Sequence, residues 1–192
     1  MPSVSLNRWR TLRADRLEQV EVGHTAVGGT GRGARYAREQ LNRSYCVLLA
    51  AEFQGFCRDL HDEAVVAMVA HLPPSFRVIV AREFARGRQL DRGNASPSTL
   101  GSDFTRLGFE CWQEFDTAEP RGPTLRRRLE EMNVWRNAIA HSDFDPRRLG
   151  GRMLLTIARV RRWRRALNRV ARVLDRVVAD HIQQTTGVRP WA

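Results

Sequence analysis

Apolar residues recur at helical spacing along most of this chain, and no segment alternates apolar and polar residues over a useful length. From about residue 35 to 70 the apolar positions follow steps of three and four, which mark one face of a long helix. Alternation is the pattern of a half-buried strand, so its absence argues against a sheet. The sequence therefore predicts an all-α helical bundle. The apolar positions of this stretch are Leu41, Tyr45, Leu49, Phe53, Phe56 and Leu60.

About five helices are expected, of which the first and the last are long. Pro73-Pro74 stops the first helix, and Pro74 begins the second, because proline fits the first turn of a helix but not its interior. Residues 87–97 contain glycine, asparagine and proline and are expected to form a loop. The other helices are expected at residues 98–117, 124–142 and 153–184, and the last of these is heavily basic.

The length of 192 residues suits one domain with a sizeable core. Residues 1–34 are assigned to an N-terminal segment, in which residues 5–22 form either a short helix or, around Val20-Glu21-Val22, a brief strand. Gly28 to Gly33 are expected to be a linker, since a phosphate-binding loop would need a flanking strand. The helical domain is expected at residues 35–186, followed by a tail at residues 187–192.

The formal net charge is +11, which favours anionic partners, nucleic acid first among them. All 32 basic residues are arginine, so a GC-rich genome contributes to this charge as well as selection. Arginine suits phosphate recognition because its planar group donates two parallel hydrogen bonds.

Other features favour a protein of the reducing cytoplasm that binds neither membrane nor metal. No stretch approaches the roughly 20 apolar residues that a spanning helix needs, and the N-terminus lacks the pattern of a secretory signal. Cys46, Cys57 and Cys111 are odd in number and fit no disulfide framework. No cysteine and histidine spacing indicates a metal site, and no cofactor is expected.

The run from Arg136 to His141, with Asn137 second, carries the candidate chemistry. An arginine five residues before a histidine should arise about once by chance in so arginine-rich a chain, so its surroundings decide. Arg136 occupies the position that the apolar stripe of Leu125, Leu129, Met132 and Ile139 leaves open, where an unpaired charge is costly.

A polar stripe lies beside that apolar one, formed by Asn133, Asn137 and His141 at steps of four. A helix C-terminus favours a protonated imidazole, so His141 is placed to donate a proton. Asp143 and Asp145 could orient its ring, although aspartate is also common in the turns that end helices.

A charged group at a core-facing position needs a counter-charge. Glu52 is the candidate partner of Arg136, because it lies between Leu49 and Phe56 in the stripe of the first long helix. The alternative is that Glu52 lies at the edge of that stripe and reaches water.

The chain contains a second arginine and histidine at this spacing, Arg176 and His181. His181 continues an apolar seam of the last helix and is expected to pack, and no polar residue follows Arg176. The arginines off that seam form either a solvated face or an RNA-contacting one, with Arg161, Arg162 and Arg165 as RNA-binding candidates.

Arg136, Asn137 and His141 together resemble the signature of the HEPN superfamily: arginine, a polar residue that is commonly asparagine, three more residues, then histidine, late in a helix of an all-α bundle. The chain looks like a member of its bacterial branch related to RiboL-PSP ribonucleases. The resemblance covers about residues 35–185, and the segment from Ala51 to Phe56 resembles the family's first long helix.

This resemblance implies a metal-independent endoribonuclease whose two copies form one composite site. His141 would be the general base or acid, Arg136 would stabilise charge on the phosphorane, and Asn137 would orient the histidine or bind phosphate. The role implied is a toxin or phage-defence effector that acts on RNA and is restrained by an antitoxin or other inhibitor protein.

Two other function classes remain open. One is a catalytically silent HEPN-type module that binds RNA or nucleotides or mediates assembly. The other is a basic helical DNA-binding protein, which ranks last because the sequence has no convincing helix-turn-helix pattern.

Overall fold

The computed structural model describes residues 1–151 and 153–191, and the regular structure in these residues is all helical, which confirms the predicted all-α class. The elements are α1 (Val4–Arg10), α2 (Leu12–Ala26), α3 (Arg32–Val69), α4 (Pro74–Ala85), the 3₁₀ turn η1 (Gln89–Asp91), α5 (Pro97–Thr105), α6 (Cys111–Ala118), α7 (Gly122–His141) and α8 (Ile157–Thr186). None of these helices has the length and apolar character needed to cross a lipid bilayer.

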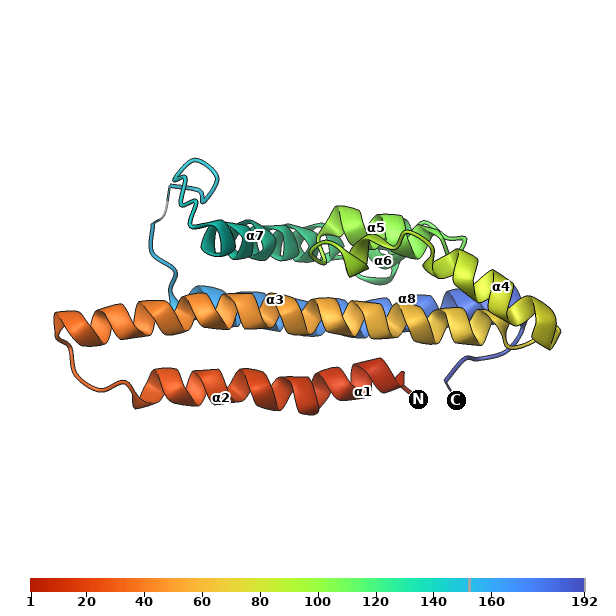
Figure 1. Ribbon diagram of the computed structural model, residues 1–192, viewed down its shortest axis with the longest axis horizontal. Coiled ribbons are helices and arrows are strands. Elements are labelled where there is room, and N and C mark those ends of the chain that lie inside the picture. The colour runs from red at the N-terminus through yellow and green to blue at the C-terminus, as the bar shows by residue number, and fades with distance from the viewer. Residues whose placement is uncertain (152, 192) are drawn as a thin grey trace.

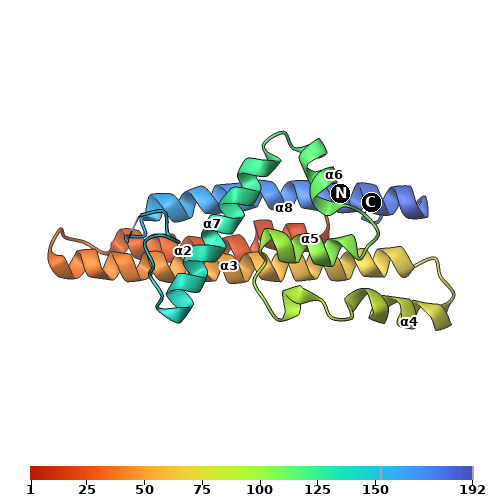
Figure 2. The same cartoon turned by 90° about the horizontal axis from the view of Figure 1, so that it is seen from above.

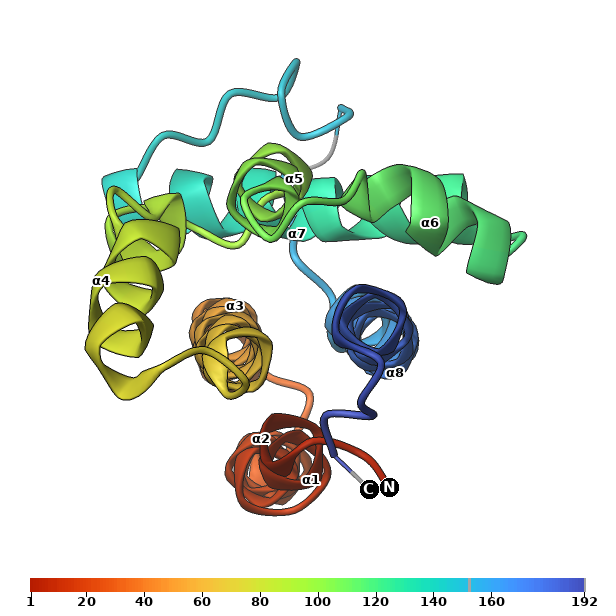
Figure 3. The ribbon, with the colours of Figure 1, turned by 90° about the vertical axis from the view of Figure 1, so that its right-hand side faces the viewer.

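The helices form three layers, as Figures 1 and 3 show. α1 and α2 make the first layer, α3 and α8 lie side by side in the second, and α5 to α7 make the third, while α4 lies beside α3 at the edge of the bundle. The second layer is therefore covered on both sides, which explains why the two longest helices carry most of the buried apolar residues. The two termini lie close together, and the Met1 amino group donates to the Trp191 carbonyl oxygen at 3.2 Å.

α3 confirms the long helix predicted at residues 35–70. Every member of the predicted apolar face from Tyr45 to Leu60 is buried. Trp9 of α1 packs against Phe53 and Phe56, with ring centroids 5.7 and 5.9 Å apart. Burying each such large side chain contributes roughly 1.5–3 kcal/mol, so this face holds the first layer onto the second.

α8 confirms the basic helix expected at residues 153–184. Thr156 caps its start, because the threonine side chain accepts from the Arg159 amide. Gly187, with φ of 76°, takes the left-handed conformation that ends helices. The predicted seam is wholly buried and comprises Val160, Trp163, Leu167, Val170, Leu174 and Val177.

α7 lies across both long helices (Figure 2). Its first half lies over α8, and its C-terminal end extends past α3. The residues that hold it there are the predicted stripe of Leu125, Leu129 and Met132 together with Trp135, and all four are buried. The helix expected at residues 124–142 is thus present, and its two ends face different surroundings.

The single helix expected at residues 98–117 is wrong, because the structure has two helices there, α5 and α6. Gly108 between them has φ of 94°, which is favourable for glycine and ends the helical path. Phe104, Leu107, Cys111 and Phe115 are all buried, as their spacing predicted. The pattern identified the core residues correctly but could not reveal the bend.

The N-terminal segment is helical, which settles the choice between helix and strand for residues 5–22 in favour of helix. Thr11, with φ of −114° and ψ of −94°, separates α1 from α2. Leu6, Trp9 and Leu17 are buried in the same core as the long helices. Residues 27–31 join α2 to α3, so the linker predicted at Gly28 to Gly33 is confirmed up to Gly31, whereas Arg32 and Gly33 already belong to α3.

The three cysteines are buried free thiols. Burial raises the pKa of Cys46 and of Cys111 to about 12, so both remain protonated at neutral pH. They belong to the apolar core.

The predicted ion pair between Glu52 and Arg136 is not formed. Glu52 is buried, as its position in the stripe predicted, but it faces α2. Its two oxygens accept from Arg13 Nη1 at 2.6 Å and Arg16 Nη1 at 3.0 Å, and Arg13 also reaches Asp59 at 2.8 Å. The physical reason is that α3 is covered on two sides, so an inward-facing residue can meet either α2 or α7.

Replacing the Glu52 carboxylate should weaken the contact between the first two layers. We expect Glu52→Gln to lower the free energy of unfolding by about 1–3 kcal/mol, because two guanidinium groups lose their charged acceptor. Urea unfolding followed by circular dichroism measures this change. The matched control is Glu83→Gln, whose pair with Arg86 is exposed and should contribute less than about 0.5 kcal/mol. Equal effects of the two substitutions would contradict this assignment.

Candidate functional site

The last turn of α7 ends in a strained but well-bonded cap. The Asp143 amide donates to the Ala138 carbonyl at 2.9 Å, and the Ser142 amide donates to the Ile139 carbonyl at 3.4 Å. This pair of bonds is the Schellman motif, which normally uses glycine at the left-handed position. Here Ser142 takes that conformation, with φ of 54°, and among the described residues it is the one non-glycine with positive φ. The backbone strain lies next to His141, and such strain often marks functional sites.

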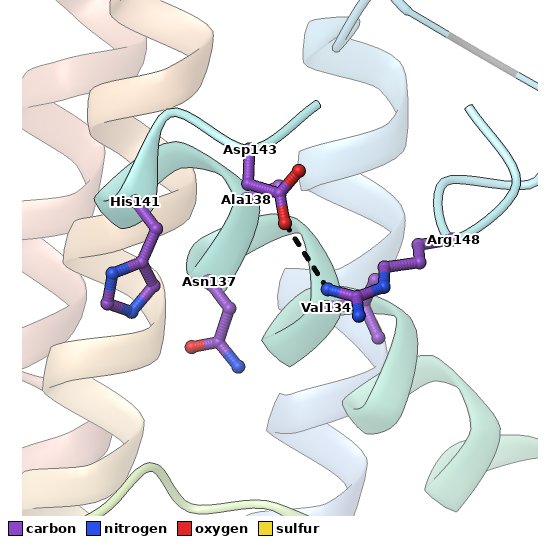
Figure 4. A pocket seen from close by; sticks show the side chains of 6 residues that line it. All are labelled: Val134, Asn137, Ala138, His141, Asp143 and Arg148. Carbon is purple, nitrogen blue, oxygen red and sulfur yellow. Dashed lines mark hydrogen bonds and ion pairs between the residues drawn. The ribbon is translucent and has the colours of Figure 1, made fainter. Parts of the chain in front are cut away.

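His141 is the last residue of α7, and its imidazole is exposed. It lies beside an open pocket of about 500 Å³, shown in Figure 4. His141 and Asn137 project to the same side of the helix because they are four residues apart. The loop after α7 closes the pocket with Asp143 and Arg148, whose charged groups lie 3.3 Å apart. The remaining lining residues are Val134 and Ala138.

Arg136 is half-buried, in agreement with its predicted position in the apolar stripe. Its Nη1 donates to Asn137 Oδ1 at 3.1 Å. Its charge also lies near Cys46 of α3: burial raises the pKa of that thiol, and the Arg136 charge partly opposes the increase. The guanidinium therefore lies at the boundary between the core and the solvent.

Asn137 connects Arg136 to the pocket. Its side-chain oxygen accepts from Arg136 and also from Asn94 Nδ2, the latter at 2.6 Å. Two donors on one oxygen fix the orientation of this amide. Asn94 belongs to the loop between η1 and α5, so that loop also contributes to the site.

Arg136 and His141 do not face one another within one chain. Five residues of an α-helix correspond to a rotation of about 140°. His141 lines the pocket, whereas Arg136 is absent from its lining. One copy therefore brings together the imidazole, the Asn137 amide and the Arg148 guanidinium, while Arg136 reaches this group only through Asn137.

Asn133, predicted to support the site, has a structural role. It is buried, and its Nδ2 donates to the Ala95 and Leu129 carbonyl oxygens, both at 3.0 Å. The side chain thus fixes the loop before α5 against α7. A step-of-four pattern places Asn133 on the same face as Asn137, but the loop that covers only the first of them was not visible in the sequence.

The aspartates after His141 do not orient its ring. Asp143 pairs with Arg148, and Asp145 Oδ1 accepts from the Arg147 amide at 2.9 Å. Both carboxylates bond to residues of the loop after α7 instead, which is the alternative that turn chemistry allowed.

His181 of the second match is packed, as predicted. Its ring stacks on Phe109 with centroids 4.4 Å apart, and its Nε2 lies 2.9 Å from the Leu107 carbonyl oxygen. Arg176 donates to the Ala118 carbonyl at 2.9 Å. The two side chains hold α8 against the segments around α6.

The three arginines of α8 proposed as RNA ligands differ in environment. Arg161 Nε donates to Glu21 Oε2 at 2.8 Å, so its charge is neutralised within the protein. Arg162 and Arg165 are exposed and point to a different face.

Arg148 and Asn94 were missed by the sequence analysis. Both lie in irregular segments, where no periodicity relates a residue to a face. The one available signal was that Arg148 follows the motif helix closely in the chain.

Among the described residues, no group of three or more His, Cys, Asp or Glu side chains could hold a metal ion. Comparison of the chain with models of known families, with curated proteins and with solved structures found no match.

The two asparagines of the polar stripe should respond differently to substitution. We expect Asn133→Ala to lower the free energy of unfolding by about 1–2 kcal/mol, because two buried hydrogen bonds are lost. Asn137→Ala should change it by less than about 0.5 kcal/mol, since this side chain is exposed. Denaturant unfolding of the two variants measures both values. A larger loss for Asn137→Ala than for Asn133→Ala would refute the assignment of roles.

Proposed function

We propose that this protein is a metal-independent endoribonuclease that cleaves RNA by attack of the 2′-hydroxyl group on the adjacent phosphate. The observation that carries the proposal is the exposed His141 imidazole beside an open pocket, with Asn137 on the same face and Arg136 bonded to that asparagine. An imidazole changes its protonation state near neutral pH and can therefore both take and give a proton.

The chemistry assigns one task to each group. His141 accepts the proton of the 2′-hydroxyl while the 2′-oxygen bonds to phosphorus. The bond from phosphorus to the 5′-oxygen breaks, and that oxygen takes a proton, which leaves a cyclic phosphate and a 5′-hydroxyl end. Arg136 stabilises the negative charge of the phosphorane by charge-assisted hydrogen bonds. DNA lacks the attacking hydroxyl, so it is not a substrate.

Arg148 adds a cation to the wall opposite His141. Its partner Asp143 is exposed, and the pair is 3.3 Å apart, so the ion pair contributes little stability. A phosphate in the pocket would compete readily for this guanidinium, and Arg148 is therefore proposed to bind substrate.

Two copies of the chain are proposed to form one composite site. The 140° between Arg136 and His141 supports this arrangement, because a single α7 cannot present both to one phosphate from one face. Two opposed helices would surround the phosphate with two guanidinium and two imidazole groups. One imidazole then acts as the base, and the other protonates the leaving oxygen.

The biological role proposed is that of a toxin or phage-defence effector that is restrained by an inhibitor protein. The support is the HEPN-like motif together with the proposed chemistry. An enzyme that cleaves the RNA backbone would damage the RNA of its own cell unless an inhibitor restrained it.

A catalytically silent HEPN-type module that binds RNA or nucleotides is the second candidate. The absence of Arg136 from the pocket lining favours it, because binding needs only the Arg148 guanidinium and the Asn137 amide that the pocket already contains.

RNA cleavage in the presence of EDTA tests the proposal directly. We expect the unmodified protein to cut RNA, and Arg136→Ala and His141→Ala to reduce the rate by at least about 100-fold. The products separated on a denaturing gel should carry cyclic phosphate ends. Matched controls are Arg82→Ala and His71→Ala, which remove an exposed arginine and an exposed histidine elsewhere.

Two outcomes would decide against the nuclease. Binding of RNA without cleavage by the unmodified protein would favour the silent module. If the control variants lost as much cleavage rate as the site variants, the cleavage would not depend on this site.

Mixing the two inactive variants tests the composite site. We expect Arg136→Ala and His141→Ala proteins, unfolded and refolded together, to regain part of the activity, because mixed dimers carry one intact arginine and one intact histidine. Each variant refolded alone is the control. A monomeric mass in solution with full activity would refute the composite site but not the reaction.

A further inference from the structure

A second basic surface lies at the other end of α7. It is a groove of about 570 Å³ between the first half of α7 and the outer face of α8. Thr124 and His141 are 17 residues apart on α7, so the groove lies about 25 Å from the imidazole. We call it the arginine groove. Its arginines are Arg121, Arg128, Arg162, Arg165, Arg169 and Arg172.

The charge of the arginine groove is not explained by composition alone. Arginines on the inner face of α8 are neutralised: Arg161 and Arg164 both pair with Glu21 of α2, and Arg164 also pairs with Glu18 of the same helix. In the groove, six guanidinium groups meet one lining carboxylate, that of Glu119. A second carboxylate, Glu131, pairs with Arg128 at 2.8 Å. Four positive charges therefore remain in excess.

The Glu119 carboxylate cannot neutralise the remainder of the groove. It is buried, and it accepts from Arg169 Nε and from the Arg121 amide. Burial alone would raise the pKa of Glu119, but these hydrogen bonds outweigh it and lower the pKa, so the group stays ionised. Within the described part of the chain, no carboxylate pairs with Arg162, Arg165 or Arg172, and all three are exposed.

The arginines of α8 in this groove form one straight stripe. Positions 162, 165, 169 and 172 follow steps of three and four and so lie along one face of the helix. The stripe is about 15 Å long, because each residue adds about 1.5 Å. That length matches about four nucleotide steps of a strand in stacked, helical form, which rises about 3.4 Å per nucleotide. Arg128 of α7 and Arg121, the residue just before that helix, line the opposite wall.

Among the described residues, the arginine groove lacks exposed apolar and aromatic side chains, and this absence limits which kind of ligand could bind there. Its apolar lining residues, Leu125 and Ala166, are each only 8% exposed, and none of the exposed large hydrophobic residues lies in it. A protein partner or a membrane would need apolar side chains to bury. No aromatic residue lines the groove on which bases could stack.

We infer that the arginine groove binds the phosphodiester backbone of a nucleic acid strand without regard to sequence. This inference goes beyond the proposed function and does not depend on it. Planar guanidinium groups donate paired hydrogen bonds to phosphate oxygens, and phosphate contacts carry no sequence information. RNA and DNA strands should therefore bind alike here, whereas only RNA could be cut at the end of α7.

Binding of labelled single-stranded DNA of about 12 nucleotides, measured by fluorescence anisotropy, tests the inference without cleavage. We expect the double variant Arg162→Glu with Arg165→Glu to weaken binding at least about tenfold, and to reduce the slope of log affinity against log salt by about 1.4. The matched control is Arg58→Glu with Arg82→Glu, which makes the same change in net charge on exposed arginines outside the groove. The affinity of the control variant for this DNA should fall by less than about threefold.

Circular dichroism of both double variants verifies folding, and neither Arg162 nor Arg165 holds the core together. RNA of the same sequence, measured with a His141→Ala background, should give an affinity within about threefold of DNA. The inference would be overturned if both double variants lost DNA affinity equally, or if neither lost any. Unchanged DNA binding together with lost binding of a glutamate-rich peptide would overturn it in favour of a protein ligand.

The outcomes are separable from those for the nuclease. A protein that binds DNA through this groove but never cuts RNA would remove the proposed function and leave this inference standing. A protein that cleaves RNA but whose DNA binding does not depend on the arginine groove would remove this inference and leave the proposed function standing.

Discussion

The packing of α7 across α3 and α8 determines where every candidate functional group lies. Its buried stripe of Leu125, Leu129 and Met132, with Trp135 beside it, fixes the helix on both long helices at once. Because α7 crosses rather than runs parallel, its buried face ends at Ala138 and the end of its last turn is left uncovered. Its first half then forms one wall of the arginine groove, and its last turn carries His141 past the edge of α3.

The distribution of charge follows from the same layering. An arginine-rich chain must either pair its guanidinium groups or expose them, since an unpaired buried charge is costly. The carboxylates of α2 and α3 meet the arginines that lie between the first two layers, as in the contacts of Glu21 and Glu52. The outer face of α8 has few such partners. Positive charge is therefore left over on one face, and that excess is what an anionic partner would meet.

Much of the fold could be predicted from periodicity. The apolar faces of α3 and α8 were identified residue by residue, and His181 was correctly assigned to packing. The error at residues 98–117 has a local cause. The bend at Gly108 depends on a single backbone conformation that leaves the apolar spacing intact, so 98–117 still had the pattern of one helix.

The candidate site shows the same division. The position of Arg136 at the edge of the core, and of Asn137 and His141 on one exposed face, could be predicted because each depends on helical geometry alone. Arg148 and Asn94 could not be, since loops bring them to the site.

The sequence by itself determined the helical class, the buried face of each long helix, and the residues with which α7 ends. Only the tertiary structure decided that Glu52 meets Arg13 rather than Arg136, that Asn133 is covered by a loop, and that Arg162 is exposed while Arg161 is paired. The physical reason is that periodicity is local: it fixes the direction in which a side chain points from its own helix. Which neighbour lies in that direction depends on how separate helices pack. The same packing decides whether each charged side chain is paired or exposed.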